Sequence, residues 1–202
     1  MSQIEIGRLL RAGTAGFVVG CRVSQIDAPS FGALIRVPLE RQGDFQVYGM
    51  IHDIHIDDDG LVRQLVTAEG VDTAIIEDNR QNRNVPLEMS VLAVGYRQDG
   101  RISHLLPPHP PLSLDMIYLC EDEEVCAFSG TGRFGYFRHL LRNKDLPLGE
   151  LLAAHMQQAG AAHAAAGNPG WVDAATQELI TLLRDDYPTL INLLGALEEI
   201  YR

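Results

Sequence analysis

Short apolar segments separated by glycine, proline and polar turns fill the first two-thirds of the chain. Four of them have the length of strands and are rich in β-branched residues: 16–23, 32–38, 47–56 and 89–96. A further apolar segment at 115–120 follows a proline-rich stretch. We therefore predict β structure throughout residues 1–128.

Two Asp-Gly steps indicate that neighbouring strands are antiparallel. Gly60 ends an acidic turn between 50–56 and 61–66, and Gly100 lies between Tyr96 and the segment 101–106. An Asp-Gly step supplies the positive φ angles that a tight hairpin requires. Glycines inside the strands favour the bends that close a small barrel. The expected fold is mainly β plus α: a small closed antiparallel β-barrel followed by a C-terminal helical region.

The hydrophobic period changes to that of helices in the last third of the chain. We expect residues 1–128 to form the barrel, 129–144 a flexible connector and 145–202 the helical region. A helix is predicted over 148–159, and another over 174–186 with Asp173 as its N-cap. Pro188 suits the first turn of a final helix.

The charge distribution argues against a nucleic-acid partner. The net charge is −11, and residues 1–126 alone carry 19 acidic against 10 basic side chains. Nucleic-acid binders need a basic surface, because neutralisation of phosphates dominates their affinity. Arg8, Arg11, Arg22 and Arg36 occur early in the chain, and we expect them to pair with acidic side chains.

The three cysteines and the absence of long apolar segments indicate the cellular location of the protein. Cys21, Cys120 and Cys126 lie in apolar surroundings and form no metal-binding or redox motif. No signal region opens the chain, and no run of eighteen apolar residues occurs in it. These observations favour a cytoplasmic protein with reduced thiols and no membrane association.

The sharpest polar cluster begins at His52. On a strand, Asp53 and His55 share one face while His52 lies on the other. Imidazole and carboxylate groups bind divalent ions, so these three residues are the candidate metal ligands of a metal-dependent hydrolase. The solvent face of a hairpin explains the same pattern and is favoured.

The remaining motifs predict no catalytic residue and no cofactor. The glycine-rich segment 129–135 lacks the Lys-Ser/Thr ending of a phosphate-binding loop, and no Gly-x-Ser-x-Gly elbow is present. The acidic run 121–124 is interpreted as a solvated turn, with a docking patch for a basic partner as the alternative.

Two apolar features are candidates for a protein interface. The first is the proline-rich segment, with Pro107, Pro108, Pro110 and Pro111, which cannot donate to a strand ladder at its prolines. The second is the apolar face of the last helix. Its members are Leu190, Leu194 and Leu197. Such a face must be covered, either by packing on the barrel or by self-association into a homo-oligomer.

The glycines and apolar residues of 6–19, 29–37 and 48–51, with the proline-rich stretch 106–111 before the last strand, resemble a known family. The pattern is similar to the HAS barrel, the small β-barrel at the N-termini of HerA-type DNA-translocating ATPases and of the ATP synthase α and β subunits. The resemblance implies a barrel that holds subunits together or docks a partner beside a motor. No phosphate loop follows it here, so no catalytic residue is carried over.

The sequence therefore favours a non-enzymatic assembly or accessory module. We expect it to mediate protein–protein contacts with an ATPase ring or a DNA-processing complex such as a nuclease. A metal-dependent hydrolase and an oligonucleotide-binding barrel are the alternatives.

Overall fold

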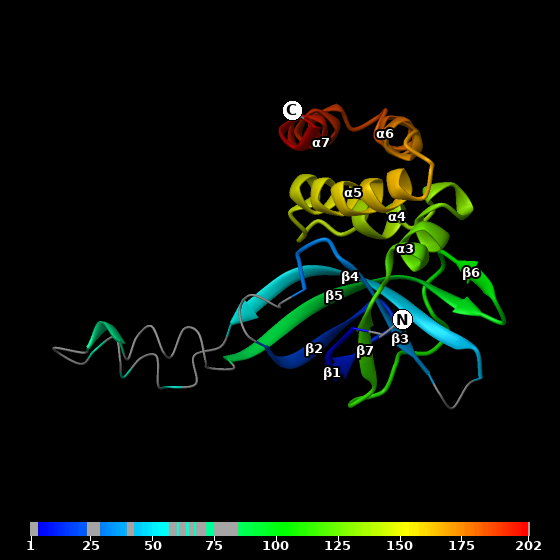
Figure 1. Ribbon diagram of the computed structural model, residues 1–202. Helices are drawn as coiled ribbons and strands as arrows, with labels where there is room; N and C mark the ends of the chain where they lie inside the picture. The colour runs from blue at the N-terminus through cyan, green and yellow to red at the C-terminus, as the bar shows by residue number, and fades with distance from the viewer. Residues whose placement is uncertain are drawn as a thin grey trace.

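A closed antiparallel β-barrel forms one half of the molecule. The computed structural model describes residues 4–23, 29–39, 43–56, 60, 64, 67, 72–74 and 85–201. In this part of the chain there are seven strands: β1 (Glu5–Ala12), β2 (Gly16–Val23), β3 (Leu34–Pro38), β4 (Phe45–Ile56), β5 (Val85–Gln98), β6 (Arg101–Ser103) and β7 (Met116–Leu119). Six of them close in the order β1-β2-β5-β4-β3-β7, and β6 pairs with β5 alone (Figure 1). The predicted fold class is confirmed.

One of the two predicted Asp-Gly hairpins is present, and the other falls largely outside the described residues. Asp99 and Gly100 have φ angles of 49° and 74° and join β5 to β6. At the first site Gln64 is helical, and its backbone amide donates to the carbonyl of Gly60. The end of β4 pairs with β5, Ile56 with Leu87. Residues 57–59, 61–63, 65 and 66 lie outside the described part.

The barrel encloses its own hydrophobic core. Alternate side chains of each strand point inward, as the period of two requires. The largest fully buried members are Leu9, Ile35, Ile51, Leu87, Met89 and Ile117. These aliphatic side chains fill the space between the strands.

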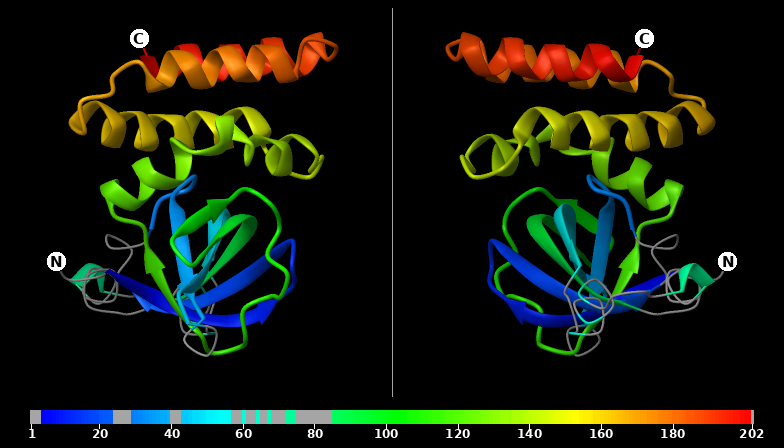
Figure 2. Two further views of the ribbon diagram at one scale, coloured as in Figure 1. Left: turned by 90° about the vertical axis from the view of Figure 1, so that its right-hand side faces the viewer. Right: turned by 90° about the vertical axis from the view of Figure 1, so that its left-hand side faces the viewer.

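Helices cover the outer face of β3, β4 and β5. Among the described residues they are α3 (Asp122–Ser129), the 3₁₀ turn η2 (Gly132–Phe134), α4 (Phe137–Leu141), α5 (Leu148–Ala165), α6 (Trp171–Leu182) and α7 (Tyr187–Tyr201). We call this set the helical cap. In Figure 2, α5 crosses above the barrel, and α6 and α7 form an outer layer on α5. None of these helices is long and apolar enough to cross a membrane.

A second core joins the cap to the barrel. Tyr48 and Met50 on β4 and Val94 on β5 point outward from the barrel and pack with Phe128, Leu151 and other cap residues. The continuous apolar run in β4 is explained by this arrangement, because both faces of the strand are buried. Barrel and cap are therefore packed together over a shared hydrophobic surface.

Residues 129–144, predicted to be a flexible connector, are packed structure. They contain η2 and α4, and Tyr136, Phe137 and Leu140 are fully buried. The glycines of this segment suggest a flexible chain, but Gly132, Arg133 and Phe134 all have positive φ angles and form a tight turn. The aromatic and leucine side chains that follow hold this segment in the second core.

Helix boundaries differ from the predicted ones at the end of the first helix and at both ends of the second, which stops at Leu182 instead of residue 186. The first predicted helix continues through the alanine-rich stretch to Ala165, because alanine has the highest helix propensity. α6 begins at Trp171 rather than after Asp173, since the indole is buried in the second core. Pro188 lies in the first turn of α7, as predicted.

The turn before β3 docks on α5. Gly32 has a φ of +80°, and a Cβ atom built there would lie 2.8 Å from the backbone nitrogen of His155. Its carbonyl accepts a hydrogen bond from Nδ1 of His155 at 3.2 Å. The side-chain amide of Gln158 donates to the carbonyl of Phe31 at 2.9 Å. Only glycine allows so close an approach of barrel and cap.

Candidate functional site

The barrel opens where β3 leaves β7. The two strands pair at only two positions, Ile35 with Leu119 and Arg36 with Tyr118. Pro38, the next residue of β3 on the β7 side, has no amide hydrogen to donate, which ends the ladder. The strands separate there and leave a hollow in the outer wall of the barrel.

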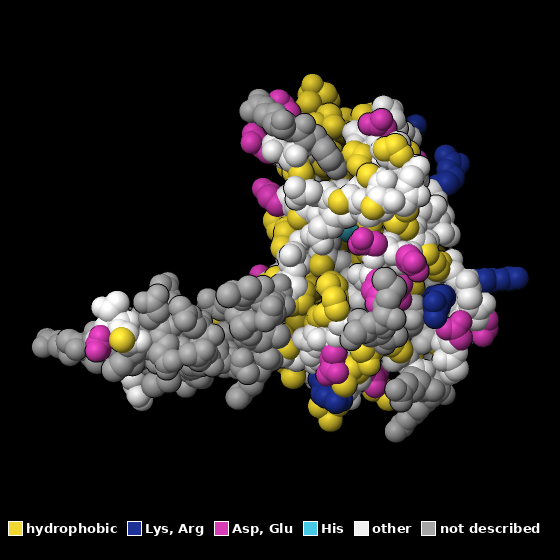
Figure 3. All heavy atoms as spheres, in the orientation of Figure 1, with side chains coloured by type: hydrophobic (Ala, Val, Ile, Leu, Met, Phe, Trp, Pro, Cys, Tyr) yellow, Lys and Arg dark blue, Asp and Glu magenta, His cyan; other side chains and the backbone are white. Residues whose placement is uncertain are grey.

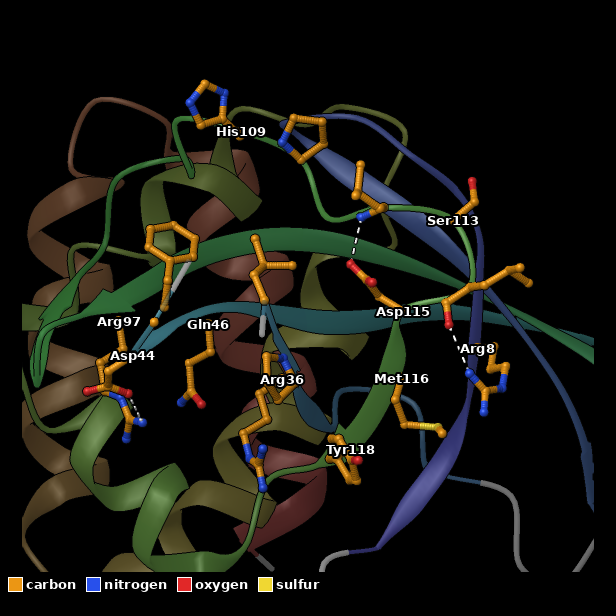
Figure 4. Close-up of a pocket in the computed structure, with 17 residues that line it drawn as sticks. Arg8, Arg36, Asp44, Gln46, Arg97, His109, Ser113, Asp115, Met116 and Tyr118 are labelled. Carbon is orange, nitrogen blue, oxygen red and sulfur yellow. Dashed lines mark hydrogen bonds and ion pairs between the residues drawn. The ribbon is translucent and has the colours of Figure 1, made fainter. Parts of the chain in front are cut away.

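This hollow is a groove of about 1110 Å³ between the barrel wall and the proline-rich loop (residues 104–115). Its wall comes from β3, β4 and β7, with contributions from β1 and β5 (Figure 4). Three arginines, Arg97, Arg36 and Arg8, are spread across it. Its volume is that of a site for a ligand or a short peptide segment.

Arg36 is a buried charged residue of the groove, with only 6% of its surface exposed. Its Nε atom lies 2.6 Å from a carboxylate oxygen of Glu124 on α3. The guanidinium lies over the ring of Tyr118, 4.9 Å from its centroid. An ion pair and a cation–π contact thus accompany the burial of this side chain.

Arg97 lies at one end of the groove and is partly exposed. Its Nη2 atom donates to Oδ1 of Asp44 at 2.7 Å. The other oxygen of Asp44 accepts the amide of Gly100 at 3.1 Å, which ties the groove to the β5–β6 turn. Between the two arginines, the buried amide of Gln46 donates to the hydroxyl of Tyr48 at 2.5 Å. Burial raises the pKa of Tyr48 to about 12, so this phenol stays protonated.

Arg8 lies at the opposite end, beside the end of the proline-rich loop. It donates to the carbonyl of Leu114 at 3.1 Å. A carboxylate oxygen of Asp115 accepts the amide of Leu112 at 2.8 Å. Both contacts are visible in Figure 4. They fix the end of the loop against the barrel, and Leu114 has a positive φ of 73° in this turn.

Two exposed leucines line this end of the groove, and a third lies on the adjacent strand β1. Leu112 and Leu114 are 56% and 67% exposed, and Leu10 on β1 is also exposed. The strands hold them together, because Leu114 donates its amide to the carbonyl of Leu9 and the hydroxyl of Ser113 donates to that of Leu10. We call Leu10, Leu112 and Leu114 the leucine rim. In Figure 3, hydrophobic side chains lie beside charged ones at the lower end of the barrel.

The proline-rich segment predicted as an interface borders the same groove. Pro110 is one of the lining residues, and Pro108 is exposed. Pro107 and Pro111 are buried and anchor the loop. The structure thus brings the proline-rich segment together with the arginines, a combination that sequence reasoning did not make.

The predicted leucine face of the last helix is turned inward. Leu190 and Leu197 belong to the second core, and Leu194 is partly buried against it. The face is covered within the cap, by packing of α7 on α5, and not by the barrel itself. Because Leu190 and Leu197 pack within the chain, they are not available for a partner in this structure.

The metal-ligand candidates lie on the far part of β4. A register shift at His52 places that residue in a bulge, and Asp53 and His55 are exposed on either side of the partly buried Ile54. Desolvation lowers the pKa of His52, and the charge of Asp53 opposes this. Among the described residues, no group of three or more His, Cys, Asp or Glu side chains is arranged to hold a metal ion.

The acidic run 121–124 is a helix start rather than a solvated turn. Glu121 and Glu124 form a capping box at the first turn of α3, and Glu124 also pairs with Arg36. A capping box satisfies backbone amides that a helix start otherwise leaves unpaired. Arg36 is therefore paired with an acidic residue as predicted, but Arg97 was not singled out. The position of Arg97 just before the Asp99-Gly100 turn was the sequence feature that could have identified it.

No protein-family model matches the chain, and a search of the curated proteins finds no significant match either.

Proposed function

We propose that this protein is a non-enzymatic protein-binding module whose partner docks in the groove beside the proline-rich loop. The observation that carries the proposal is the leucine rim next to three arginines at the opening between β3 and β7. Arginine and large apolar residues are enriched at the centres of protein interfaces. Exposed apolar clusters bordered by polar groups are characteristic of such sites.

The helical cap leaves this surface open. The cap covers part of the outer face of β3, β4 and β5 through the second core, and Glu124 of α3 reaches Arg36 beside the groove, which lies at the β3–β7 opening. The groove is the part of the barrel wall at which a partner can reach buried polar groups.

The resemblance to HAS barrels supplies the class of partner. A barrel that docks beside a motor fits an accessory subunit of an ATPase ring or of a DNA-processing complex such as a nuclease. The closed six-stranded barrel supports this proposal at the level of fold. The free thiols of Cys21, Cys120 and Cys126 support a cytoplasmic location.

Site-specific photo-cross-linking tests the proposed surface. A photoreactive p-benzoylphenylalanine replaces Leu112 in the leucine rim, and a matched protein carries it at Leu182, which is also exposed but lies on α6. Both are expressed in the cells of origin and irradiated. We expect a discrete protein adduct from position 112 and none of that mass from position 182.

The result against the proposal is equally specific. No adduct at position 112, with a protein that is folded by circular dichroism and monomeric by light scattering, contradicts it. An adduct from position 182 alone would place the interface on the cap. An adduct containing a second copy of this chain would make the groove a self-association surface.

A further inference from the structure

We infer that the groove binds an extended partner segment in which carboxylate side chains alternate with apolar ones. This inference rests on the proposed function and specifies the partner. Three features carry it: the charge of the groove, the chemistry that Arg36 already performs, and the interrupted strand pairing at its wall.

The lining of the groove is more basic than the molecule as a whole. Arg8, Arg36 and Arg97 line it together with two aspartates, in a chain whose net charge is −11. Arg36 and Arg97 are paired with the carboxylates of Glu124 and Asp44, whereas the contact of Arg8 is with the carbonyl of Leu114. Asp115 accepts the amide of Leu112. Arg8 therefore provides the attractive charge for an anionic ligand on this otherwise acidic protein.

The contacts of Arg36 indicate which kind of anion the groove binds. Its Nε atom already binds the carboxylate of Glu124 at 2.6 Å, and Tyr118 holds the plane of the guanidinium. A guanidinium is a planar fork that matches carboxylate geometry. Because burial has already fixed this side chain, binding a further carboxylate costs little side-chain entropy. A segment bearing Asp or Glu is thus the matching partner.

The backbone around the groove favours an extended ligand. β3 and β7 are antiparallel and are not paired beyond Arg36 and Tyr118. Pro38 and Met116, which come next on each strand, both line the groove. A partner strand can lie along this opening and use the unpaired backbone, as in β-augmentation. Its carboxylates then face the arginines while its apolar side chains face Leu39 and the leucine rim.

Nucleic acid fits the same groove less well. Single strands need free aromatic faces for base stacking. Arg36 covers Tyr118, and Phe45 stacks on Tyr96 with ring centroids 5.4 Å apart. The aromatic rings near the groove are therefore already in contact with other side chains.

Fluorescence anisotropy with defined probes tests the inference on the full-length protein. The probe is a fluorescein-labelled peptide in which Asp and Glu alternate with Val and Ile. Comparison probes replace the acids with Asn and Gln, or with Lys, and a fourth is oligothymidylate of equal length. We expect saturable binding of the acidic peptide, about tenfold weaker binding of the amide peptide, and weakening by added salt.

Three variants locate the binding in the groove. Arg8→Glu is expected to weaken the acidic peptide about tenfold, because it replaces an attractive charge with a repulsive one. Asp44→Asn is expected to tighten it severalfold by removing an anion from the groove, a gain that misfolding cannot produce. Arg184→Glu, at a side chain 75% exposed on the far side of the cap, is the matched control and is expected to change nothing.

Several outcomes overturn the inference. These are equal binding of the amide peptide, tighter binding of the Lys peptide or of oligothymidylate, a loss with Arg184→Glu equal to that with Arg8→Glu, or no gain with Asp44→Asn. If the groove nevertheless cross-links to a protein through position 112, the proposed function stands and only the acidic partner is wrong. If both experiments fail, the groove is not a docking site.

Discussion

Gly32 is a residue at which barrel and cap approach closely. Its neighbours leave no room for a side chain, and its φ of +80° strains any residue other than glycine. We expect Gly32→Ala to lower the free energy of unfolding by about 2–4 kcal/mol, from strain plus a backbone clash. Urea denaturation measures this loss.

Gly167 provides a control for the backbone strain alone. It has a φ of +83°, and a Cβ atom there would meet nothing within 4 Å. Gly167→Ala should therefore cost only about 1 kcal/mol. Equal losses for the two variants would show that the contact between Gly32 and α5 does not contribute.

His155 makes the stability provided by the contact between Gly32 and α5 dependent on pH. Burial lowers its pKa to about 4, while the hydrogen bond to Gly32 opposes the shift, and Nε2 lies 2.9 Å from the hydroxyl of Tyr136. The unfolded chain binds the proton more tightly than the folded one. Stability is therefore fully present above about pH 6.5 and is lost as the pH falls towards 4, by about 3 kcal/mol.

Urea midpoints measured between pH 7 and pH 4 test this expectation. His155→Gln should flatten the pH dependence even though it lowers stability at neutral pH. His109→Gln, at an exposed histidine of the proline-rich loop, should leave the slope unchanged. An unchanged slope in His155→Gln would refute the assignment.

At the scale of elements, α3 connects the groove to the rest of the cap. One carboxylate oxygen of Glu124 pairs with Arg36, and the other accepts the amide of Glu121 in the capping box. Glu124→Gln keeps a capping acceptor but removes the charge from a nearly buried arginine. We expect a loss of about 1–3 kcal/mol, reduced from the fully buried case because Glu124 is partly exposed.

Glu123→Gln on the same helix turn is the matched control, because Glu123 is exposed. Its unfolding free energy should stay within about 0.5 kcal/mol of the parent. If thermal or urea denaturation gives the two variants the same stability, the Arg36–Glu124 pair does not hold α3 on the barrel.

Elements with a strong local signal could be predicted from the sequence, and those set by distant contacts could not. The Asp99-Gly100 turn and the start of α7 at Pro188 depend on local backbone preferences. The start of α6 depends on burial of Trp171, and the partner of β4 depends on Leu87, which lies far away in the sequence. The candidate groove exists because Pro38 ends the pairing of β3 with β7. The sequence alone does not show that these two strands are neighbours, so the groove could not be predicted from it.

At the scale of the whole molecule, barrel and cap share the second core. Tyr48, Met50 and Val94 contact cap residues while the strands that carry them also enclose the barrel core. The two halves should therefore unfold together. Trp171, the single tryptophan of the chain, is buried in the cap and reports on that half.

Tryptophan fluorescence and far-ultraviolet circular dichroism at a strand-sensitive wavelength are expected to give the same urea midpoint. Met50→Ala, on the barrel, should shift both midpoints equally, by about 2–4 kcal/mol in free energy. A fluorescence transition that precedes the loss of β signal would mean that the cap unfolds independently.

The central claim is that partners bind at the opening between β3 and β7. Hydrogen–deuterium exchange of the protein, alone and with the partner captured through position 112, tests it most directly. We predict slower exchange in residues 36–39, 43–46 and 109–118, with residues 171–200 of the cap unchanged. Protection confined to α6 and α7, or no protection in either groove segment, would contradict the assignment of the groove as the binding site.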